Sequence, residues 1–223
     1  RVMYQIFPAR IPFSNDGTAE AGIEYHKRLG QTPELHASLD EPVRWQPRSW
    51  EKSYSPDDFY GGTLKGIEQK LPYLKQLGVS VLYFNPIFCA RTNHKYDTSD
   101  YRKVDPMFGD EQALARLCKE AEALGMRVML DGVFSHVGSD SIYFDAKHRF
   151  GTGAVSNPAS EYRDWFTCRH FPDDYVSWWD VPTLPCVDKN APSFVGYIID
   201  EPDSVVAHWM KLGAAGFRLD VAD

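Results

Sequence analysis

The dipeptide Leu-Gly occurs at three points where a helical pattern of apolar residues gives way to a short apolar run, at 77–78, 124–125 and 212–213. Before each point, apolar residues recur every three or four positions, which predicts an amphipathic helix that the glycine ends. The run after each point is typical of a buried strand, and residues 2–8 form a fourth such run. Strands that alternate with helices in this way predict a parallel sheet.

The three joins are unevenly spaced, with 47 residues between the first two and 88 between the second and the third. The additional residues of the longer interval follow His136. We therefore predict an inserted subdomain over 137–196, between a barrel portion at 1–136 and a helix and strand at 197–223. Residues 14–58, which contain several prolines and no sustained period, are expected to form a long loop. A complete (β/α)8 barrel takes about 250 residues before insertions, so we expect this chain to hold about the first four strands of one.

The helices are expected near 64–77, 114–124 and 205–212. Pro72 lies inside the first of them and is expected to kink or restart it, because proline removes a backbone donor. Asp110 precedes the second at a position typical of an N-cap.

The composition narrows the class of protein. A formal net charge of −7 argues against a nucleic-acid or anionic membrane surface, and no apolar run approaches the roughly 20 residues that span a bilayer. Residues 1–8 do not have the pattern of a signal peptide. The four cysteines lack metal-site spacing, so we expect reduced thiols, no metal site and a cytoplasmic protein.

Residues 216–221 predict a strand that carries chemistry. Phe217, Leu219 and Val221 alternate with polar residues, so Arg218 and Asp220 point to the same side. A carboxylate in a barrel is costly to bury unless a cation compensates it, and Arg218 is the candidate. A structural ion pair at a strand end is the alternative interpretation.

Two further polar segments follow predicted strands, at His94–Tyr101 and at Asp131–His136. The carboxyl ends of parallel barrel strands open on the same mouth, where such barrels keep their reacting groups. We therefore expect both segments to converge with Arg218 and Asp220.

Five blocks of the chain resemble, in the same order, the α-amylase family of glycoside hydrolases, and more narrowly its neopullulanase, cyclomaltodextrinase and maltodextrin-glucosidase branch. The end of the inserted segment, with Trp178-Trp179 and Leu184-Pro185, also resembles the B domain of that branch. The resemblance implies a (β/α)8 catalytic barrel with a B subdomain after the third strand. It also implies a retaining enzyme that hydrolyses α-1,4, and in some members α-1,6, glucosidic bonds of maltodextrins, cyclodextrins or pullulan. The blocks are Met3–Pro8, Phe59–Ile67, His94–Tyr101, Asp131–His136 and Gly216–Asp220.

The resemblance also implies roles for single residues. Asp220 resembles the nucleophile that forms a covalent glycosyl-enzyme, and Arg218 resembles the arginine that keeps this carboxylate ionised and oriented. His136 resembles the histidine that hydrogen-bonds the sugar at the scissile bond, and Tyr96 the tyrosine that stacks on that sugar. Asp131 resembles an aspartate that braces the site.

The chain departs from the family pattern in two respects. The general acid of the family is a glutamate after the fifth barrel strand, so these 223 residues are expected to be inactive on their own. Ser135 and Thr63 stand where many members have calcium-binding Asn and Asp, and the Ser14–Gly17 loop is short. We therefore predict no tightly held calcium and no cofactor.

Other functions remain open from the sequence. They are a transglycosylase, an α-glucosidase acting on short sugars of the trehalose or sucrose type, a non-catalytic relative that accompanies membrane transporters, and a glycan-binding module. In this branch, a domain before the barrel often joins two copies of the protein into a homodimer. The protein partner that the resemblance suggests is therefore a second copy of the same protein.

Overall fold

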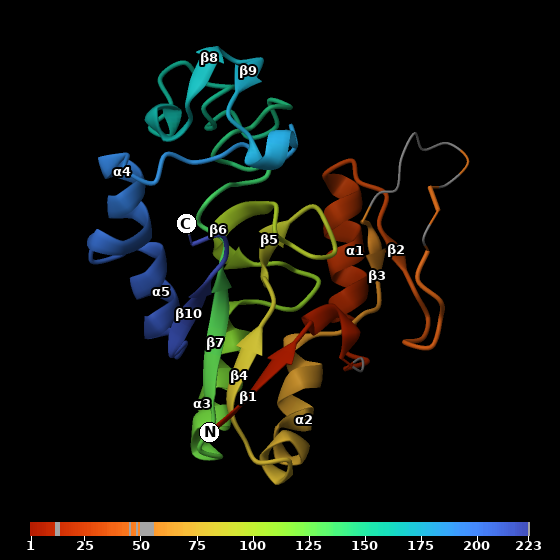
Figure 1. Cartoon of the computed structure of the whole chain (residues 1–223). Coiled ribbons are helices and arrows are strands. Elements are labelled where there is room, and N and C mark those ends of the chain that lie inside the picture. The colour runs from red at the N-terminus through yellow and green to blue at the C-terminus, as the bar shows by residue number, and fades with distance from the viewer. Residues whose placement is uncertain (12–13, 45, 48, 50–55, 223) are drawn as a thin grey trace.

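The structure is a computed structural model that describes residues 1–11, 14–44, 46–47, 49 and 56–222. A four-stranded parallel sheet forms its centre, and the strand order follows the chain (Figure 1). This order, with helices between the strands, is that of half a (β/α)8 barrel. The strands are β1 (Val2–Ile6), β4 (Val79–Phe84), β7 (Arg127–Gly132) and β10 (Gly216–Leu219).

Three helices precede strands of this sheet, namely α2 (Leu64–Gln76), α3 (Glu111–Ala123) and α5 (Val205–Lys211). The predicted N-cap of α3 is confirmed, because the Asp110 carboxylate accepts a hydrogen bond of 2.7 Å from the backbone N–H of Ala113. The glycine of each Leu-Gly join has a positive φ and ends its helix, as predicted.

The core lies between the sheet and these helices. Leu64, Ile67, Leu114 and Leu117 are fully buried, and each such side chain stabilises the fold by about 1.5–3 kcal/mol. Trp209 of α5 is also fully buried, and its indole N–H donates to the carbonyl of Tyr101 over 2.8 Å. Most apolar residues of the predicted helical stripes are therefore buried, although Leu77 and Met210 are about half exposed.

Several local features differ from the expectations. Helix α2 does not restart at Pro72 but continues through it, since the buried side chains on either side, Leu71 and Leu74, hold it against the core. The expected long loop contains a helix, α1 (Thr18–Arg28), whose buried face is short and interrupted by polar residues. A helical segment, α4 (Pro192–Val195) followed by η4 (Gly196–Asp200), precedes α5 and was not predicted.

The segment between β7 and α4 extends beyond the carboxyl ends of the sheet strands (Figure 1). Its regular structure is limited, in the part described, to short strands and single turns. Antiparallel bridges join His136 to Cys186 and Ser177 to Pro185, so the end of the segment returns to its beginning. The elements are η2 (Arg163–Trp165), β8 (Cys168–His170), β9 (Asp174–Tyr175) and η3 (Trp178–Asp180).

Shorter elements complete the molecule. A hairpin of β5 and β6 follows β4, and β2 pairs with β3 in parallel. No helix in the described ranges is long and apolar enough to cross a bilayer. The elements are η1 (Pro8–Arg10), β2 (Glu34–Leu35), β3 (Asp58–Phe59), β5 (Phe88–Ala90) and β6 (Thr98–Val104).

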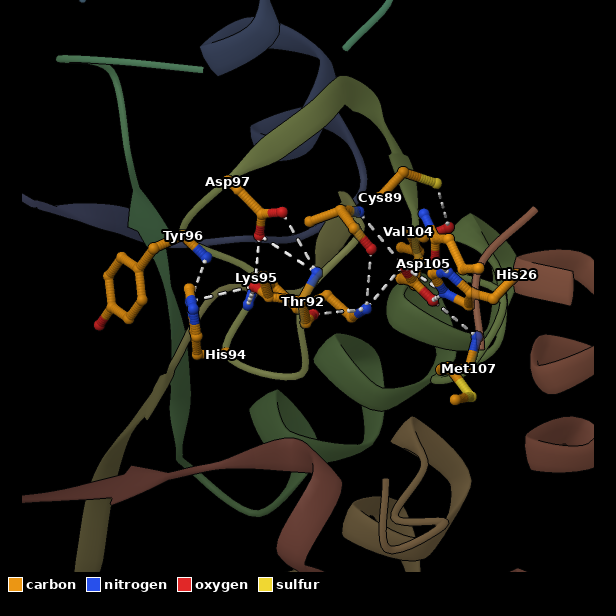
Figure 2. A network of polar contacts seen from close by, with 12 residues as sticks. His26, Cys89, Thr92, His94, Lys95, Tyr96, Asp97, Val104, Asp105 and Met107 are labelled. Carbon is orange, nitrogen blue, oxygen red and sulfur yellow. Dashed lines mark hydrogen bonds and ion pairs between the residues drawn. The ribbon is translucent and has the colours of Figure 1, made fainter. Parts of the chain in front are cut away.

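A buried ion network joins α1 to the loop between β5 and β6 (Figure 2). Lys95 and Asp105 are fully buried, with 2.8 Å between Nζ and Oδ2, and His26 Nε2 lies 3.0 Å from Oδ1 of the same carboxylate. Burial raises the pKa of Asp105, but attraction to Lys95 and the hydrogen bond with His26 outweigh it, and the pKa lies well below its ordinary value. The Lys95 ammonium also donates to the carbonyls of Ala90 and Thr92, which fixes the course of the loop.

Substitution of Asp105 by Asn is expected to destabilise the protein by about 3–5 kcal/mol, because it leaves the Lys95 ammonium buried without its counter-ion. The measurement is the free energy of unfolding in urea. The matched control is Glu122→Gln, which breaks the exposed pair with Arg127 and should change stability little. Equal effects of the two substitutions would contradict the prediction.

Candidate active site

The site begins with an arginine that joins two carboxylates at the carboxyl ends of neighbouring strands. Arg218 of β10 stands opposite Asp131 of β7 in the parallel register. Its Nη1 donates to Asp131 Oδ1 over 3.1 Å and to Asp220 Oδ1 over 2.6 Å. Burial lowers the pKa of Arg218, but the hydrogen bonds that it donates to both carboxylates outweigh this effect, and the net shift of the pKa is upward. The guanidinium therefore stays charged and holds Asp220 in place.

Asp131 is the buried anchor of this group, with 1% of its surface exposed. Its Oδ2 accepts hydrogen bonds from the hydroxyls of Tyr83 and Tyr96, while Oδ1 faces Arg218. Burial raises the pKa of Asp131 above its ordinary value, although the Tyr83 hydroxyl and Arg218 both oppose this shift. Both carboxylate oxygens of Asp131 therefore already accept hydrogen bonds from neighbouring protein side chains.

Tyr96 extends the hydrogen-bonded chain toward the first strand. Its hydroxyl accepts from Asn85 Nδ2 over 3.2 Å, and Gln5 Nε2 donates to Asn85 Oδ1 over 2.9 Å. Burial and the nearby Asp131 charge raise the pKa of Tyr96, so the phenol stays neutral. One chain of polar contacts thus runs from β1 across β4 and β7 to the end of β10.

His136 is buried next to this chain, with 2% of its surface exposed. Its Nδ1 lies 2.9 Å from the Ser135 hydroxyl, which orients the ring. Its Nε2 is buried and makes no hydrogen bond of normal geometry to the described residues, although the Tyr96 carbonyl lies close enough to favour the protonated ring. Burial lowers the pKa of His136, and the Asp220 charge opposes that shift. The neutral imidazole therefore keeps one nitrogen that can still make a hydrogen bond, although protein atoms cover it in this structure.

Asp220 lies at the edge of the site, with 16% of its side chain exposed. Its backbone N–H donates to the carbonyl of Gly132 over 3.1 Å, so the pairing of β10 with β7 extends to the carboxylate itself. The group is therefore positioned by the sheet, held by one guanidinium and open to solvent. This is what a carboxylate nucleophile requires.

The five residues singled out in the sequence therefore meet at one mouth. Arg218, Asp131, Asp220 and Tyr96 form a single hydrogen-bonded chain. The charge of Asp220 acts on His136 by raising its pKa, against the larger effect of burial.

Comparison with known proteins gives the family. A model of the α-amylase catalytic domain matches residues 5–223. The chain belongs to the α-amylase family of glycoside hydrolases. An amylopullulanase of Thermoanaerobacter thermohydrosulfuricus is 38% identical over the whole chain, and neopullulanase 2 of Thermoactinomyces vulgaris is 36% identical over the whole chain. The solved type III pullulan hydrolase of Thermococcus kodakarensis is 31% identical over 99% of the chain, with a TM-score of 0.79.

The chain matches only part of each of these proteins. It spans 17% of the amylopullulanase, 34% of neopullulanase 2 and 37% of the solved pullulan hydrolase. The expected (β/α)8 fold is confirmed, and the four-stranded sheet is the part of that barrel which this chain supplies.

Sequence reasoning missed three polar residues of this α-amylase-type site. Gln5, Tyr83 and Asn85 complete the chain of contacts around Tyr96 and Asp131. Their positions carried a signal, because Tyr83 lies near the end of β4 and Asn85 directly follows it, two residues on and so on the same face. An apolar strand that ends in such a polar pair next to the candidate site is better interpreted as part of that site.

Lys95 was also missed, although it directly precedes Tyr96. It adopts a positive φ of 64° and points its ammonium inward to Asp105, while the Tyr96 ring points away from the ion network (Figure 2). The backbone N–H of Tyr96 donates to His94 Nδ1 over 3.2 Å, which fixes the turn. The buried lysine therefore anchors the loop that presents Tyr96.

The residues at the two calcium positions that the family resemblance implies do not fit a tight calcium site. The Ser135 hydroxyl is held by the ring of His136. Asp16 Oδ1 accepts from Ser14 and from the N–H of Thr18, and Thr63 Oγ1 serves as the N-cap of α2. The side chains at these positions are therefore already engaged by neighbouring protein groups.

Treatment with EDTA is accordingly expected to leave the melting temperature of the complete protein unchanged, and elemental analysis should find less than stoichiometric calcium. Calcium that remains at one equivalent after dialysis, or a melting temperature that falls on chelation, would contradict this prediction.

His136 is expected to titrate below 6.5, the ordinary value for histidine, because burial lowers its pKa. The measurement is the pH dependence of its imidazole resonances in NMR, assigned with the His136→Gln variant. Since the pKa in the folded state lies below the unfolded value, protonation favours unfolding, and stability should fall as the pH drops below 6.5. The variant should lose this part of the dependence. A midpoint at or above 6.5 would contradict the prediction.

Proposed function

We propose that the complete protein carrying this chain is a retaining glycosidase that hydrolyses α-glucosidic bonds of maltodextrins, cyclodextrins or pullulan. The observation that carries the proposal is the Asp220 carboxylate, which Arg218 holds at 2.6 Å while its side chain remains partly open to solvent. The family of the chain supports the reaction class, and the amylopullulanase, neopullulanase and pullulan hydrolase relatives support an α-glucan substrate.

In this mechanism, Asp220 attacks the anomeric carbon of the bound sugar and forms a covalent glycosyl-enzyme that water then hydrolyses. Arg218 holds the carboxylate by a hydrogen bond of 2.6 Å and so fixes the direction of attack. The ring of Tyr96 packs against the C–H face of the sugar, and His136 hydrogen-bonds one of its hydroxyls, as the family resemblance implies. Because His136 Nε2 is covered by protein in this structure, that contact requires a local movement on binding.

A retaining enzyme needs a second carboxyl group, about 5–5.5 Å from the first, to act as acid and then base. Asp131 does not suit that role, because Tyr83, Tyr96 and Arg218 occupy its two oxygens. The family resemblance assigns the acid to a glutamate after the fifth barrel strand. We therefore expect residues 1–223 alone to be inactive.

The proposal extends to the organisation of the chain. Residues 1–136 and 197–223 are assigned to the barrel, and residues 137–196 to a B subdomain that covers the mouth. The antiparallel backbone bridge between His136 and Cys186 returns the end of this segment to its beginning, which supports the assignment. The four free cysteines fit a reducing, cytoplasmic location. The homodimer stays a prediction.

Substitution of Asp220 by Asn in the complete protein is expected to lower hydrolysis by at least about a thousandfold, because the amide cannot form the glycosyl-enzyme. Maltotriose, β-cyclodextrin, pullulan and starch are the substrates, and products are identified by chromatography. Early products should have the α configuration by NMR, as retention requires. The control is Asp203→Asn, an exposed carboxylate in the turn before α5, which should behave like the wild-type protein.

Hydrolysis that survives in Asp220→Asn would remove Asp220 as the nucleophile. Products that first appear in the β configuration would exclude retention. A complete protein without turnover on any of the four glucans would contradict the proposed activity.

A further inference from the structure

A large aromatic side chain stands in solvent near the candidate site, and nothing in the core accounts for it. Trp179 in η3 is 83% exposed, more than any other large hydrophobic residue in the described ranges. It lies in the segment that returns to His136, on a turn closed by a hydrogen bond of 2.9 Å from the N–H of Val181 to the carbonyl of Trp178.

The backbone of this turn is an unusual place for a tryptophan. Trp179 has a φ of 49° and Asp180 a φ of 59°, so both central residues are left-handed. Such turns favour Asn and Gly, because a bulky side chain makes the left-handed region unfavourable. A strained conformation that persists at a site far from the core indicates a functional constraint.

The indole is held in a stack that leads to the catalytic mouth. Trp179 lies parallel to Trp178, with ring centroids 5.2 Å apart and an angle of 17° between the planes. Trp178 in turn lies over His136, with centroids 5.6 Å apart at 34°. The backbone N–H of Trp178 donates to the carbonyl of Leu184 over 2.9 Å, which anchors the middle residue of the stack. One face of Trp179 therefore packs on Trp178, and the outer face is open.

We propose that the outer face of Trp179 binds a glucosyl unit of the α-glucan chain outside the unit that reacts at Asp220. An indole face matches the C–H face of a pyranose ring, and a ring fixed by stacking loses little conformational freedom on binding. The carboxylate of Asp180, exposed on the same turn, supplies an acceptor for sugar hydroxyls. This inference rests on the proposed function, because it assigns a longer substrate to the same site.

The surroundings of Trp179 favour a sugar over a protein partner. Val176 is the only other large hydrophobic residue between 133 and 191 that is prominently exposed, at 44%. A stable protein interface buries about 800 Å² on each side, which an isolated ring and one valine do not supply. A single flat ring beside a carboxylate suits one sugar unit.

The test compares glucans of increasing length on the complete protein. In Trp179→Ala, the ratio of kcat/KM for maltoheptaose to that for maltotriose is expected to fall about tenfold, mainly through KM. Trp179→Phe should restore most of the ratio, since it keeps a flat aromatic face. The control is Tyr73→Ala, which removes an aromatic residue that is 56% exposed on α2, and it should leave the ratio unchanged.

A binding measurement separates this inference from the proposed function. Calorimetry with maltoheptaose in the Asp220→Asn background should show about tenfold weaker binding when Trp179→Ala is added. Turnover with an unchanged ratio and unchanged binding would overturn the subsite and leave the hydrolase. Binding that depends on Trp179 without any turnover would support the subsite and remove the hydrolase.

Two outcomes would overturn the subsite outright. One is a complete protein that neither binds maltoheptaose nor cleaves it. The other is a dimer in analytical ultracentrifugation that Trp179→Ala dissociates while the ratio for long and short glucans stays the same, because Trp179 would then contact a second copy of the chain.

Discussion

The ion pairs of Arg218 are the interaction on which the site depends. Arg218 reaches Asp131 on the neighbouring strand and Asp220 two residues later on its own strand, so one guanidinium ties together two strand ends. The parallel register places Arg218 opposite Asp131, and a shift of one residue would turn these side chains to the other face. The packing of the helices on the sheet preserves this register. The position of Asp220 therefore depends on the pairing of the strands in the sheet.

A second group of charges supports the other side of the mouth. Lys95, Asp105 and His26 are buried together, and a charge buried without a partner would cost several kcal/mol. The network is stable because each of its charged members is paired. It also fixes the loop that contains Lys95 and, directly after it, Tyr96. Charged residues thus act in two ways in this protein. The exposed end of the Arg218 group meets substrate in the proposed mechanism, while the Lys95 group is closed to solvent and holds backbone.

The sequence predicted the three helices between the sheet strands, the four strands and the residues that meet at their ends, because each rests on a local rule. Apolar spacing, the Asp110 cap and the glycine stops determine the elements, and parallel strands bring their carboxyl ends to one edge. Helix α1 escaped prediction because its buried face is short and carries His26, a polar residue that Asp105, far along the chain, helps to make favourable to bury. Pro72 does not make α2 restart, because the packing of Leu71 and Leu74 against the core keeps the helix continuous.

The sequence by itself determined the fold class, the family resemblance and the identity of Asp220, Arg218, Asp131, His136 and Tyr96 as candidates. Tertiary structure alone decided how they are joined. It showed that Asp131 has no free oxygen, that Tyr83 and Asn85 belong to the site, and that Trp179 stands on a stack over His136. The physical reason is that local sequence determines the direction of a side chain, whereas its partners come from strands and loops distant in the chain. The packing of those segments decides which charges are paired and which aromatic rings remain exposed to solvent.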